Sequence, residues 1–284
     1  MSDAAITAAE IEQYCSHVGL TAEHADTVDP HVALQLAATL DADVPDQVLP
    51  PLWHYGLFQT SVGTAALDID GHPKRGDFLP PVRLPRRMFA AAALKFIKPL
   101  TIGQDVSRLS RVSSVDHRSG KTGALVFVRV AITLSQAGSV CVEEEQTIAY
   151  RPAGGSTPAV KIAPWLPLKP GDAGEIWLPT TKELFRYSAA TFNTHRIHYD
   201  QSYATETEGY PDLVVHGPLI ATRLCAFAAK VAGGELADFA FRGKAPSFVG
   251  QELRLTGAKT NETVAVRIER GDGVVAMSAT ATVR

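Results

Sequence analysis

The chain has 284 residues, of which 45% are hydrophobic and 20% charged, and its formal net charge is -3 at pH 7. This balance predicts a soluble globular protein with a full apolar core, divided into about two domains or forming one large one. It excludes the basic surface that is typical of nucleic-acid binding. No apolar run approaches the roughly 18 residues that a membrane-spanning helix needs.

The N-terminal stretch 1–15 contains acidic residues but no basic segment, so we expect no signal peptide. The three cysteines, Cys15, Cys141 and Cys225, are odd in number, far apart and in no CxxC motif. They predict no disulfide framework, and this usage is typical of a protein of the reducing cytoplasm.

Two parts of the chain share a pattern of paired alternating segments. Residues 124–134 and 139–151 alternate apolar and polar side chains on either side of a glycine-containing turn. Residues 264–270 and 274–284 do the same around a Gly-Asp-Gly turn. Alternation with period two predicts half-buried antiparallel strands, and the turns predict that each pair is a hairpin.

The repeat extends upstream of each hairpin. The segment LQLAATLD at 34–41 is echoed by RYSAATFN at 186–193, and each is followed by a second segment, 49–58 in the first copy and 213–234 in the second. The stretch 213–234 predicts a helix with an apolar stripe. Gly217-Pro218 suits its start, because proline has no N–H to lose in the first turn, and a glycine pair suits its end.

Between the copies, the stretch 151–177 is rich in proline and glycine and has no periodicity, so it predicts a linker. We therefore expect two duplicated α+β units, each with one helix on a long antiparallel sheet, because this packing buries both apolar faces. We place the first unit at 1–152, the linker at 153–175 and the second unit at 176–284.

The stretch TFNTHRIHYDQ, 191–201, concentrates polar side chains that are scattered elsewhere. His195 and His198 are three residues apart and Asp200 follows, so a metal site has to be considered. Three ligands from one short segment, with no distant cysteine or histidine partner, make a poor site. We therefore predict no metal there.

Asn193 lies five residues before His198 in the same stretch. On a helix this spacing would separate the two side chains by about 140°. If both line one site, the segment must be a loop or a broken helix. The alternative is that Asn193 caps a helix that begins near Thr194.

Four stretches together carry a family resemblance: LPPLWHYGLF (49–58), DGHPKRGDFLPPVRLPRRMFA (70–90), RYSAATFNTHRIHYD (186–200) and EGYPDLVVHGPL (208–219). They resemble the MaoC-like hydratase/dehydratase superfamily. The closer resemblance is to its branch with a fatty-acid-synthase-like dehydratase domain at the N-terminus, which includes mesaconyl-C4-CoA and itaconyl-CoA hydratases and 3-hydroxyacyl-thioester dehydratases. This resemblance implies the double hotdog, an α+β fold of two tandem units in which a long antiparallel sheet wraps around a central helix.

The resemblance also implies catalytic roles. Hydration of an α,β-unsaturated thioester needs a base for the attacking water and donors that stabilise the enolate. His198 would be the acid/base, Asn193 would position the water, and the Gly217 N–H would stabilise the enolate oxygen at a helix N-terminus. The broader superfamily has aspartate where Asn193 stands, and an amide cannot act as a base. A structural polar contact for His198 and a simple helix start at Gly217 are the alternatives.

Neighbouring residues are candidates for substrate binding. His195 and Arg196 lie within the motif, and the Arg196 fork would suit a substrate carboxylate or a CoA phosphate. The alternative for Arg196 is an ion pair with Asp200. His216, before Gly217, would orient the loop or touch substrate, and a satisfied structural histidine is the alternative.

Arg86 and Arg87 belong to a modest basic cluster in the first copy, completed by Arg83, Lys95 and Lys98. The cluster could receive the phosphates of CoA, or it could be a solvated strand edge. The first copy has no histidine pair after its LAATLD segment. We therefore expect the first unit to be degenerate and to shape the acyl tunnel.

Together these features predict a hydro-lyase that reversibly adds water to a 2-enoyl-CoA without a cofactor. A branched C5 dicarboxylyl-CoA, such as mesaconyl-C4-CoA or itaconyl-CoA, is the favoured substrate, and a 3-hydroxyacyl-ACP or -CoA dehydratase of fatty acid metabolism is the alternative. The expected partner is a small acyl-CoA rather than nucleic acid or a membrane, and a homo-oligomer formed through sheet edges stays open.

Two rival functions use the same fold. A thioesterase would want a carboxylate near the helix start, where only Asp212 is close in sequence. A non-catalytic acyl-CoA-binding module would bind a ligand without turning it over. Both rivals stay open, because fold alone does not give function.

Overall fold

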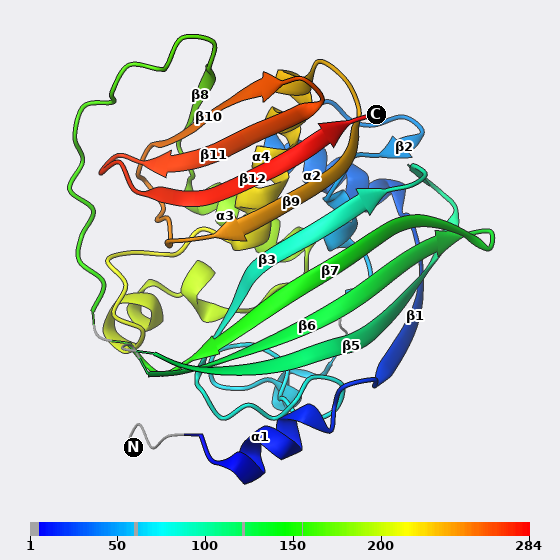
Figure 1. The fold of residues 1–284 in the computed structure, drawn as a ribbon, viewed down its shortest axis with the longest axis vertical. Coiled ribbons are helices and arrows are strands. Elements are labelled where there is room, and N and C mark those ends of the chain that lie inside the picture. Colours follow the sequence, from blue (N-terminus) through cyan, green and yellow to red (C-terminus); the bar gives the residue numbers. More distant parts are fainter. Residues whose placement is uncertain (1–5, 60–61, 121–122, 155) are drawn as a thin grey trace.

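The computed structural model describes residues 6–59, 62–120, 123–154 and 156–284. Within them, one ten-stranded antiparallel sheet dominates the molecule (Figure 1). From edge to edge its strands are β1 (Thr21–Thr27), β5 (Asp105–Gly120), β6 (Gly123–Gln136), β7 (Ser139–Arg151), β3 (Arg86–Phe96), β9 (Leu236–Gly243), β12 (Val275–Val283), β11 (Thr263–Arg270), β10 (Leu253–Thr260) and β8 (Ala173–Trp177). A separate short pair joins β2 (Val48–Leu49) to β4 (Leu100–Thr101).

The strand order has an internal symmetry that matches the sequence repeat. From the centre outwards, the first half runs β3-β7-β6-β5-β1 and the second runs β9-β12-β11-β10-β8. The halves join where β3 pairs with β9, from Ala91 opposite Arg242 to Lys95 opposite Asp238. The tandem arrangement of two α+β units predicted from the repeat is therefore present in the fold.

Both predicted hairpins are confirmed. β6 turns into β7 through Ala137 and Gly138, which both have positive φ, 45° and 73°, as a tight hairpin turn requires. β11 turns into β12 through the predicted Gly-Asp-Gly turn. The linker is shorter than predicted, because Ala173–Trp177 already forms β8 and pairs with β10. The exact unit boundaries stay a prediction.

Of the four α-helices in the described residues, the last three lie together against one face of the sheet, and the N-terminal one lies apart from them (Figure 1). The helices are α1 (Ala8–Cys15), α2 (Pro30–Leu40), α3 (Thr181–Ala190) and α4 (Gly217–Ala232), with short helical turns η1 (Trp53–Gly56), η2 (Thr64–Ala66), η3 (Arg196–His198) and the π-helical η4 (Tyr203–Thr207). The echoed segments form α2 and α3, which contact each other, and α4 packs on β9 to β12. No helix in these described ranges combines the length and apolar character needed to cross a bilayer.

The predicted helix in 213–234 is α4. It starts one residue from the expected cap, with His216 at the N-cap and Pro218 in the first turn, and it ends at Gly233 with a φ of 71°. Leu219 and Leu224 on its stripe are fully buried. The sequence therefore predicted this helix well, because proline, glycine and the apolar stripe all mark it locally.

The expectation of one helix per unit is wrong, because the first unit has α1 and α2 and the second has α3 and α4. The segment of the first unit that corresponds to α4 in the repeat forms only the turn η1. Two prolines precede η1, and Leu52 and Phe58 on either side of it have positive φ, 69° and 53°, so a longer helix cannot propagate there. A buried polar group occupies this region instead. Glu144 accepts a hydrogen bond from the Tyr55 hydroxyl at 2.8 Å and lies 3.2 Å from His54 Nε2.

Candidate active site

The catalytic candidates follow the end of α3, where the chain leaves the helix abruptly. α3 ends at Ala190, Phe192 has a φ of 49°, and the Asn193 N–H donates to the Ser188 carbonyl at 2.8 Å. The chain then runs as a loop to the short turn η3, which contains His198. The segment is thus a broken helix, as required if Asn193 and His198 share a site.

Asn193 shapes this loop. Its side-chain Oδ1 accepts the backbone N–H of His195 at 2.9 Å, which forms a local turn. The alternative role of Asn193 as a helix cap is wrong, because η3 begins only at Arg196 and has no side-chain cap hydrogen bond. The amide nitrogen of Asn193 makes no hydrogen bond with the residues that the structure describes, so it is available as a donor.

His198 is buried and held in one orientation. Its Nδ1 donates to the Val214 carbonyl at 2.7 Å, and the residue is 7% exposed. Because a carbonyl only accepts, Nδ1 carries the proton and Nε2 of the neutral ring presents a lone pair. Burial lowers the pKa of His198 well below its usual value, and nearby His195 and His72 lower it further. The ring is therefore a neutral base at pH 7.

His216 stacks on His198. The ring centroids are 3.7 Å apart and the planes differ by 21°. His216 Nε2 lies 2.8 Å from Ser188 Oγ, and the residue is fully buried. Burial, followed by the field of His198, lowers the pKa of His216 well below its usual value. His216 thus packs against His198 and contacts Ser188 through Nε2, whereas its buried Nδ1 has no hydrogen-bond partner among the described residues.

Gly217 begins α4 directly after His216. Its N–H has no partner among the described residues, as is normal for the first residues of a helix. A Cβ added to Gly217 would meet nothing closer than the Phe89 carbonyl oxygen at 3.6 Å. A backbone donor at a helix N-terminus that has no partner suits a developing anion.

The first unit contributes two residues that the sequence analysis did not assign to the site, Asp70 and His72. The His72 backbone N–H donates to Asp70 Oδ1 at 2.9 Å, and His72 Nδ1 donates to Asp70 Oδ2 at 3.0 Å. The His72 ring lies 4.1 Å, centroid to centroid, from that of His195. His195 in turn lies 5.2 Å, edge to face, from His198. Four imidazoles and one carboxylate from both units therefore form one cluster.

Close backbone contact holds the two units together at this point. The Arg196 N–H donates to the Asp70 carbonyl at 2.9 Å. Gly71 has a φ of 91°, and a Cβ there would lie 1.8 Å from the Thr194 carbonyl oxygen. Only glycine allows this approach. The Asp-Gly-His sequence at 70–72 lay within a stretch that carried the family resemblance, and its glycine between two titratable residues was the available signal.

Burial and mutual fields set the charge of the cluster. Burial would raise the pKa of Asp70, but the hydrogen bonds and charge of His72 and the charge of His195 lower it well below its usual value. Burial lowers the pKa of His72 despite Asp70, and burial followed by the charge of His72 lowers the pKa of His195 to about 3. The cluster therefore holds one carboxylate and neutral imidazoles near pH 7.

The donor atoms of Asp70, His72 and His195 lie within 4.8 Å of one another, as in some metal sites. Both Asp70 oxygens accept hydrogen bonds from His72, whereas the His195 ring makes no hydrogen bond with the described residues. The motif considered from sequence, with Asp200, is not what the fold assembles, because Asp200 binds Arg196. The absence of a metal stays a prediction.

Arg196 forms the ion pair with Asp200 that the sequence left open. Its NH2 group lies 2.8 Å from Asp200 Oδ2, another nitrogen donates to the Ile69 carbonyl at 3.1 Å, and its guanidinium covers the Tyr203 ring at 4.2 Å. These contacts fix the Arg196 side chain between the 191–201 segment and the first unit. A direct role in substrate binding stays a prediction.

Arg86 and Arg87 differ sharply although they are adjacent on β3. Arg86 is 7% exposed, lies 2.7 Å from a Glu208 carboxylate oxygen and covers the Tyr210 ring at 5.3 Å. Arg87 is half-buried and forms no hydrogen bond or ion pair within the described part of the chain. It lines a small pocket together with Asp70 and His195. Of the two, Arg87 is the one with a guanidinium open to a ligand.

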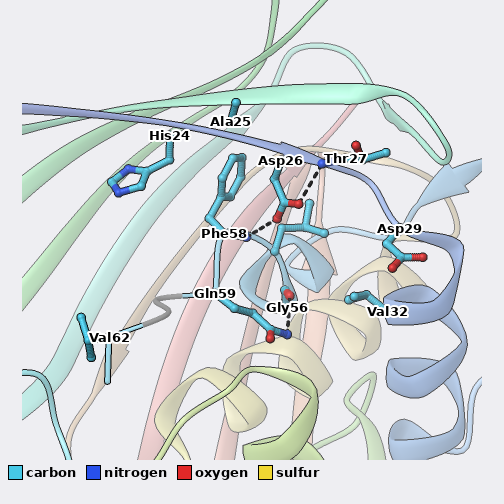
Figure 2. A pocket seen from close by; sticks show the side chains of 11 residues that line it. His24, Ala25, Asp26, Thr27, Asp29, Val32, Gly56, Phe58, Gln59 and Val62 are labelled. Carbon is cyan, nitrogen blue, oxygen red and sulfur yellow. Dashed lines mark hydrogen bonds between the residues drawn. The ribbon is translucent and has the colours of Figure 1, made fainter. Parts of the chain in front are cut away.

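A larger pocket of about 520 Å³ lies elsewhere in the first unit, between β1, α2 and the segment after η1 (Figure 2). Its wall includes Asp26, whose oxygens accept the N–H groups of Thr27 at 2.8 Å and Phe58 at 2.6 Å. None of the histidines of the cluster lines it. Asp26 fixes the segment after η1, and the pocket is separate from the candidate catalytic groups.

Solved structures with the same architecture define the fold class. A MaoC-like dehydratase matches with a TM-score of 0.71 at 16% identity, covering 95% of this chain and 98% of that one. HtdX of Mycobacterium tuberculosis matches with a TM-score of 0.69 at 17% identity, covering 92% and 99%. A further Mycobacterium tuberculosis protein, described as a double hotdog, matches with a TM-score of 0.57 at 11% identity, covering 93% and 96%. The predicted double hotdog fold is confirmed.

Sequence relatives define the family. The family model for hydroxyacyl-thioester dehydratase type 2 matches residues 52–249, and the chain belongs to this family. Mesaconyl-C(4)-CoA hydratase of Chloroflexus aurantiacus is 40% identical over 93% of this chain and 95% of that protein. The mitochondrial hydroxyacyl-thioester dehydratase type 2 of Schizosaccharomyces pombe is 28% identical over 78% and 81%. The predicted hydratase/dehydratase activity on acyl thioesters, and with it the class of hydro-lyase, is confirmed.

Proposed function

We propose that this chain reversibly hydrates a short 2-enoyl-CoA, with a branched C5 dicarboxylyl-CoA such as mesaconyl-C4-CoA as its substrate. The relative that is 40% identical over nearly the whole chain supports this acyl group. The observation that supports this reaction is the protonation state of His198. Its Nδ1 is bound to a carbonyl and its pKa is lowered by burial, so that Nε2 is a free base.

In the proposed mechanism His198 removes a proton from water. The water oxygen bonds to Cβ of the substrate, and the electrons of the C=C bond move onto the thioester oxygen as an enolate. The Gly217 N–H, at the positive end of α4, stabilises that charge. The enolate then collapses, and protonated His198 returns the proton to Cα, so base and acid are the same residue.

Asn193 has a supporting role in this proposal. Its Oδ1 is occupied by the His195 N–H, whereas its amide nitrogen is free to donate. A donated hydrogen bond orients the lone pairs of the water and leaves its proton facing His198. An amide suffices at this position, because neutral His198 already acts as the base and needs no aspartate to assist it.

The remaining assigned residues act around this centre. His195 and His216 keep His198 neutral and oriented, and Arg196 and Arg86 hold the loops that close the site. The mechanism uses no cofactor or metal. We place the protein in the reducing cytoplasm, a setting with which its free cysteines are consistent.

The proposal is tested by following the loss of enoyl-thioester absorbance with crotonyl-CoA, mesaconyl-C4-CoA or itaconyl-CoA as the substrate. His198→Ala should reduce kcat by about 100-fold or more, whereas His31→Ala, an exposed histidine on α2, is the matched control. Release of free CoA without hydration would instead identify a thioesterase. Binding of CoA esters without turnover would leave the non-catalytic module.

A further inference from the structure

Arg87 and Tyr150 are direct neighbours on adjacent strands. In the pairing of β3 with β7 they lie opposite each other. Residues paired in this way project from the same face of a sheet, with Cβ atoms about 5 Å apart. The guanidinium and the hydroxyl can therefore contact one ligand together.

Neither polar group has a partner within the described ranges. Tyr150 is fully buried, and its hydroxyl forms no hydrogen bond. Arg87 is half-buried and forms no hydrogen bond or ion pair, in contrast to its neighbour Arg86. A buried hydroxyl without a partner is costly, and such groups occur where a ligand completes them.

Arg87, one member of this pair, adjoins the catalytic cluster. Arg87 lines the small pocket that contains Asp70 and His195, and its charge lowers the pKa of both His72 and His195. No ion pair joins Arg87 to Asp70 among the described residues, and both Asp70 oxygens accept hydrogen bonds from His72. An anion that enters the pocket would therefore find Arg87 uncommitted.

The distance between Phe89 and Arg87 along β3 sets the length of the ligand. The α4 N-terminus abuts β3 at Phe89, whose carbonyl lies 3.6 Å from the Cβ position of Gly217. Arg87 is two residues earlier on the same face of the strand, a rise of about 7 Å. An acyl group whose thioester oxygen meets the Gly217 N–H would thus bring a carboxylate at the far end of a four-carbon chain towards Arg87.

The donor chemistry suits a carboxylate. Arginine offers a planar fork that matches two carboxylate oxygens. Burial raises the pKa of Tyr150, although the charges of Arg87 and Arg75 lower it, so the hydroxyl stays protonated and donates at neutral pH. The Arg75 guanidinium lies 5.1 Å from the centre of the Tyr150 ring and adds positive charge.

We infer that Arg87 and Tyr150 bind the free carboxylate of a dicarboxylyl-CoA substrate and so set specificity against monocarboxylic enoyl-CoAs. This inference rests on the proposed function. It replaces the expected assignment of Arg87 to the CoA phosphates, and it gives Arg87 the carboxylate contact considered for Arg196. The phosphates are common to all CoA esters, so a phosphate contact could not discriminate between acyl groups.

The test compares mesaconyl-C4-CoA with crotonyl-CoA, which carries the same CoA but no carboxylate. In R87Q the ratio of kcat/KM for mesaconyl-C4-CoA over crotonyl-CoA should fall about 100-fold, and in Y150F about 10-fold, as expected for loss of hydrogen bonds to a charged group. R87K should recover part of the ratio. R111Q, at an exposed arginine on β5, is the matched control and should leave the ratio unchanged.

Equal losses on both substrates in R87Q would overturn the inference, because they would indicate a CoA phosphate contact or damage to the fold. A wild-type enzyme that hydrates crotonyl-CoA but not mesaconyl-C4-CoA would also overturn it and leave a hydratase of other substrates. A wild-type enzyme that hydrates neither of these substrates nor any other 2-enoyl-CoA tested would overturn the proposed function itself.

Discussion

The imidazoles of His198 and His216 stack with their centroids 3.7 Å apart and their planes within 21° of parallel. Two protonated rings could not remain at this distance in a buried site, because the repulsion between their charges would be poorly screened. The stack therefore excludes a doubly protonated pair, and the pKa of each ring, lowered by burial, makes both rings neutral near pH 7.

The first prediction concerns the pH dependence of the rate. Because the pKa of His198 is lowered well below 6.5, kcat/KM should be flat from pH 6.5 upwards, with an acidic limb whose midpoint lies below 6.5. Burial is the largest cause of the lowering, and His195 with its pKa of about 3 carries no charge above pH 4.5, so His195→Gln should leave that midpoint below 6.5. Initial rates between pH 4.5 and 8 measure both, and a wild-type midpoint above 6.5 would refute the assignment of His198.

The second prediction concerns stability. His195, His198 and His216 have folded-state pKa values below the unfolded value of about 6.5, so below that pH the unfolded chain binds more protons than the folded one. Their contribution is present above pH 6.5 and is lost as the pH falls. Each should reduce the free energy of unfolding by about 1.4 kcal/mol per pH unit below 6.5.

Urea unfolding at pH 7.5, 6.5 and 5.5 measures this slope. His216→Asn should make it shallower by removing one titrating group, and His31→Asn, at an exposed residue of α2, serves as the reference. A stability that does not change between pH 7.5 and 5.5 would contradict the buried neutral cluster.

The third prediction separates an oxyanion role of Gly217 from a structural one. Its φ is not in the left-handed region, and an added Cβ would meet only the Phe89 carbonyl at 3.6 Å, so Gly217→Ala should change the stability by less than about 1 kcal/mol. The methyl group would nevertheless enter the space of the thioester, and kcat should fall about 100-fold. Thermal unfolding and kcat are measured on the same preparation, and full activity would exclude the role.

The fourth prediction addresses Asp70. Asp70→Asn keeps the shape but weakens the charge-assisted hydrogen bonds from His72, so it should cost about 1.5–3 kcal/mol of stability. Asp68→Asn changes an exposed carboxylate in the same loop and should cost less than about 0.5 kcal/mol. Denaturant unfolding compares the two, and equal costs would mean that the Asp70–His72 pair contributes nothing specific.

The parts of the molecule that the sequence predicted are those marked by local signals. The hairpins and α4 are defined by alternation, glycine turns and the Gly217-Pro218 start, all of which act within a few residues. The tandem arrangement followed from the repeat. The helix expected in each unit was wrong for the region of η1, where left-handed residues at Leu52 and Phe58 break a pattern that apolar content alone does not reveal.

The sequence predicted only the part of the site that lies within one segment. Asn193 and His198 were predicted as site residues because they share a short motif, and the ion pair between Arg196 and Asp200 was foreseen as an alternative. Asp70 and His72 were not, because more than a hundred residues separate them from His195 and only the docking of the first unit on the η3 loop brings them together. Such a tertiary contact has no local periodicity.

The last prediction tests that docking at its closest point. Gly71→Ala places a Cβ 1.8 Å from the Thr194 carbonyl oxygen, and the residue has a φ of 91°, so the loop must move. Gly19→Ala is a matched control, because Gly19 has a similar φ of 94° but nothing within 4 Å of an added Cβ. Gly19→Ala therefore measures the conformational cost alone, about 1–2 kcal/mol.

Gly71→Ala should cost clearly more than Gly19→Ala, because the clash with Thr194 adds to the same conformational cost. It should also reduce kcat, since the displaced loop carries Asp70 and His72 away from His195, whereas Gly19→Ala should leave kcat unchanged. Equal stability losses and equal rates in the two variants would show that the two units do not need this contact to assemble the site. A loss confined to Gly71→Ala would place the first unit within the active site of the enzyme rather than only beside it.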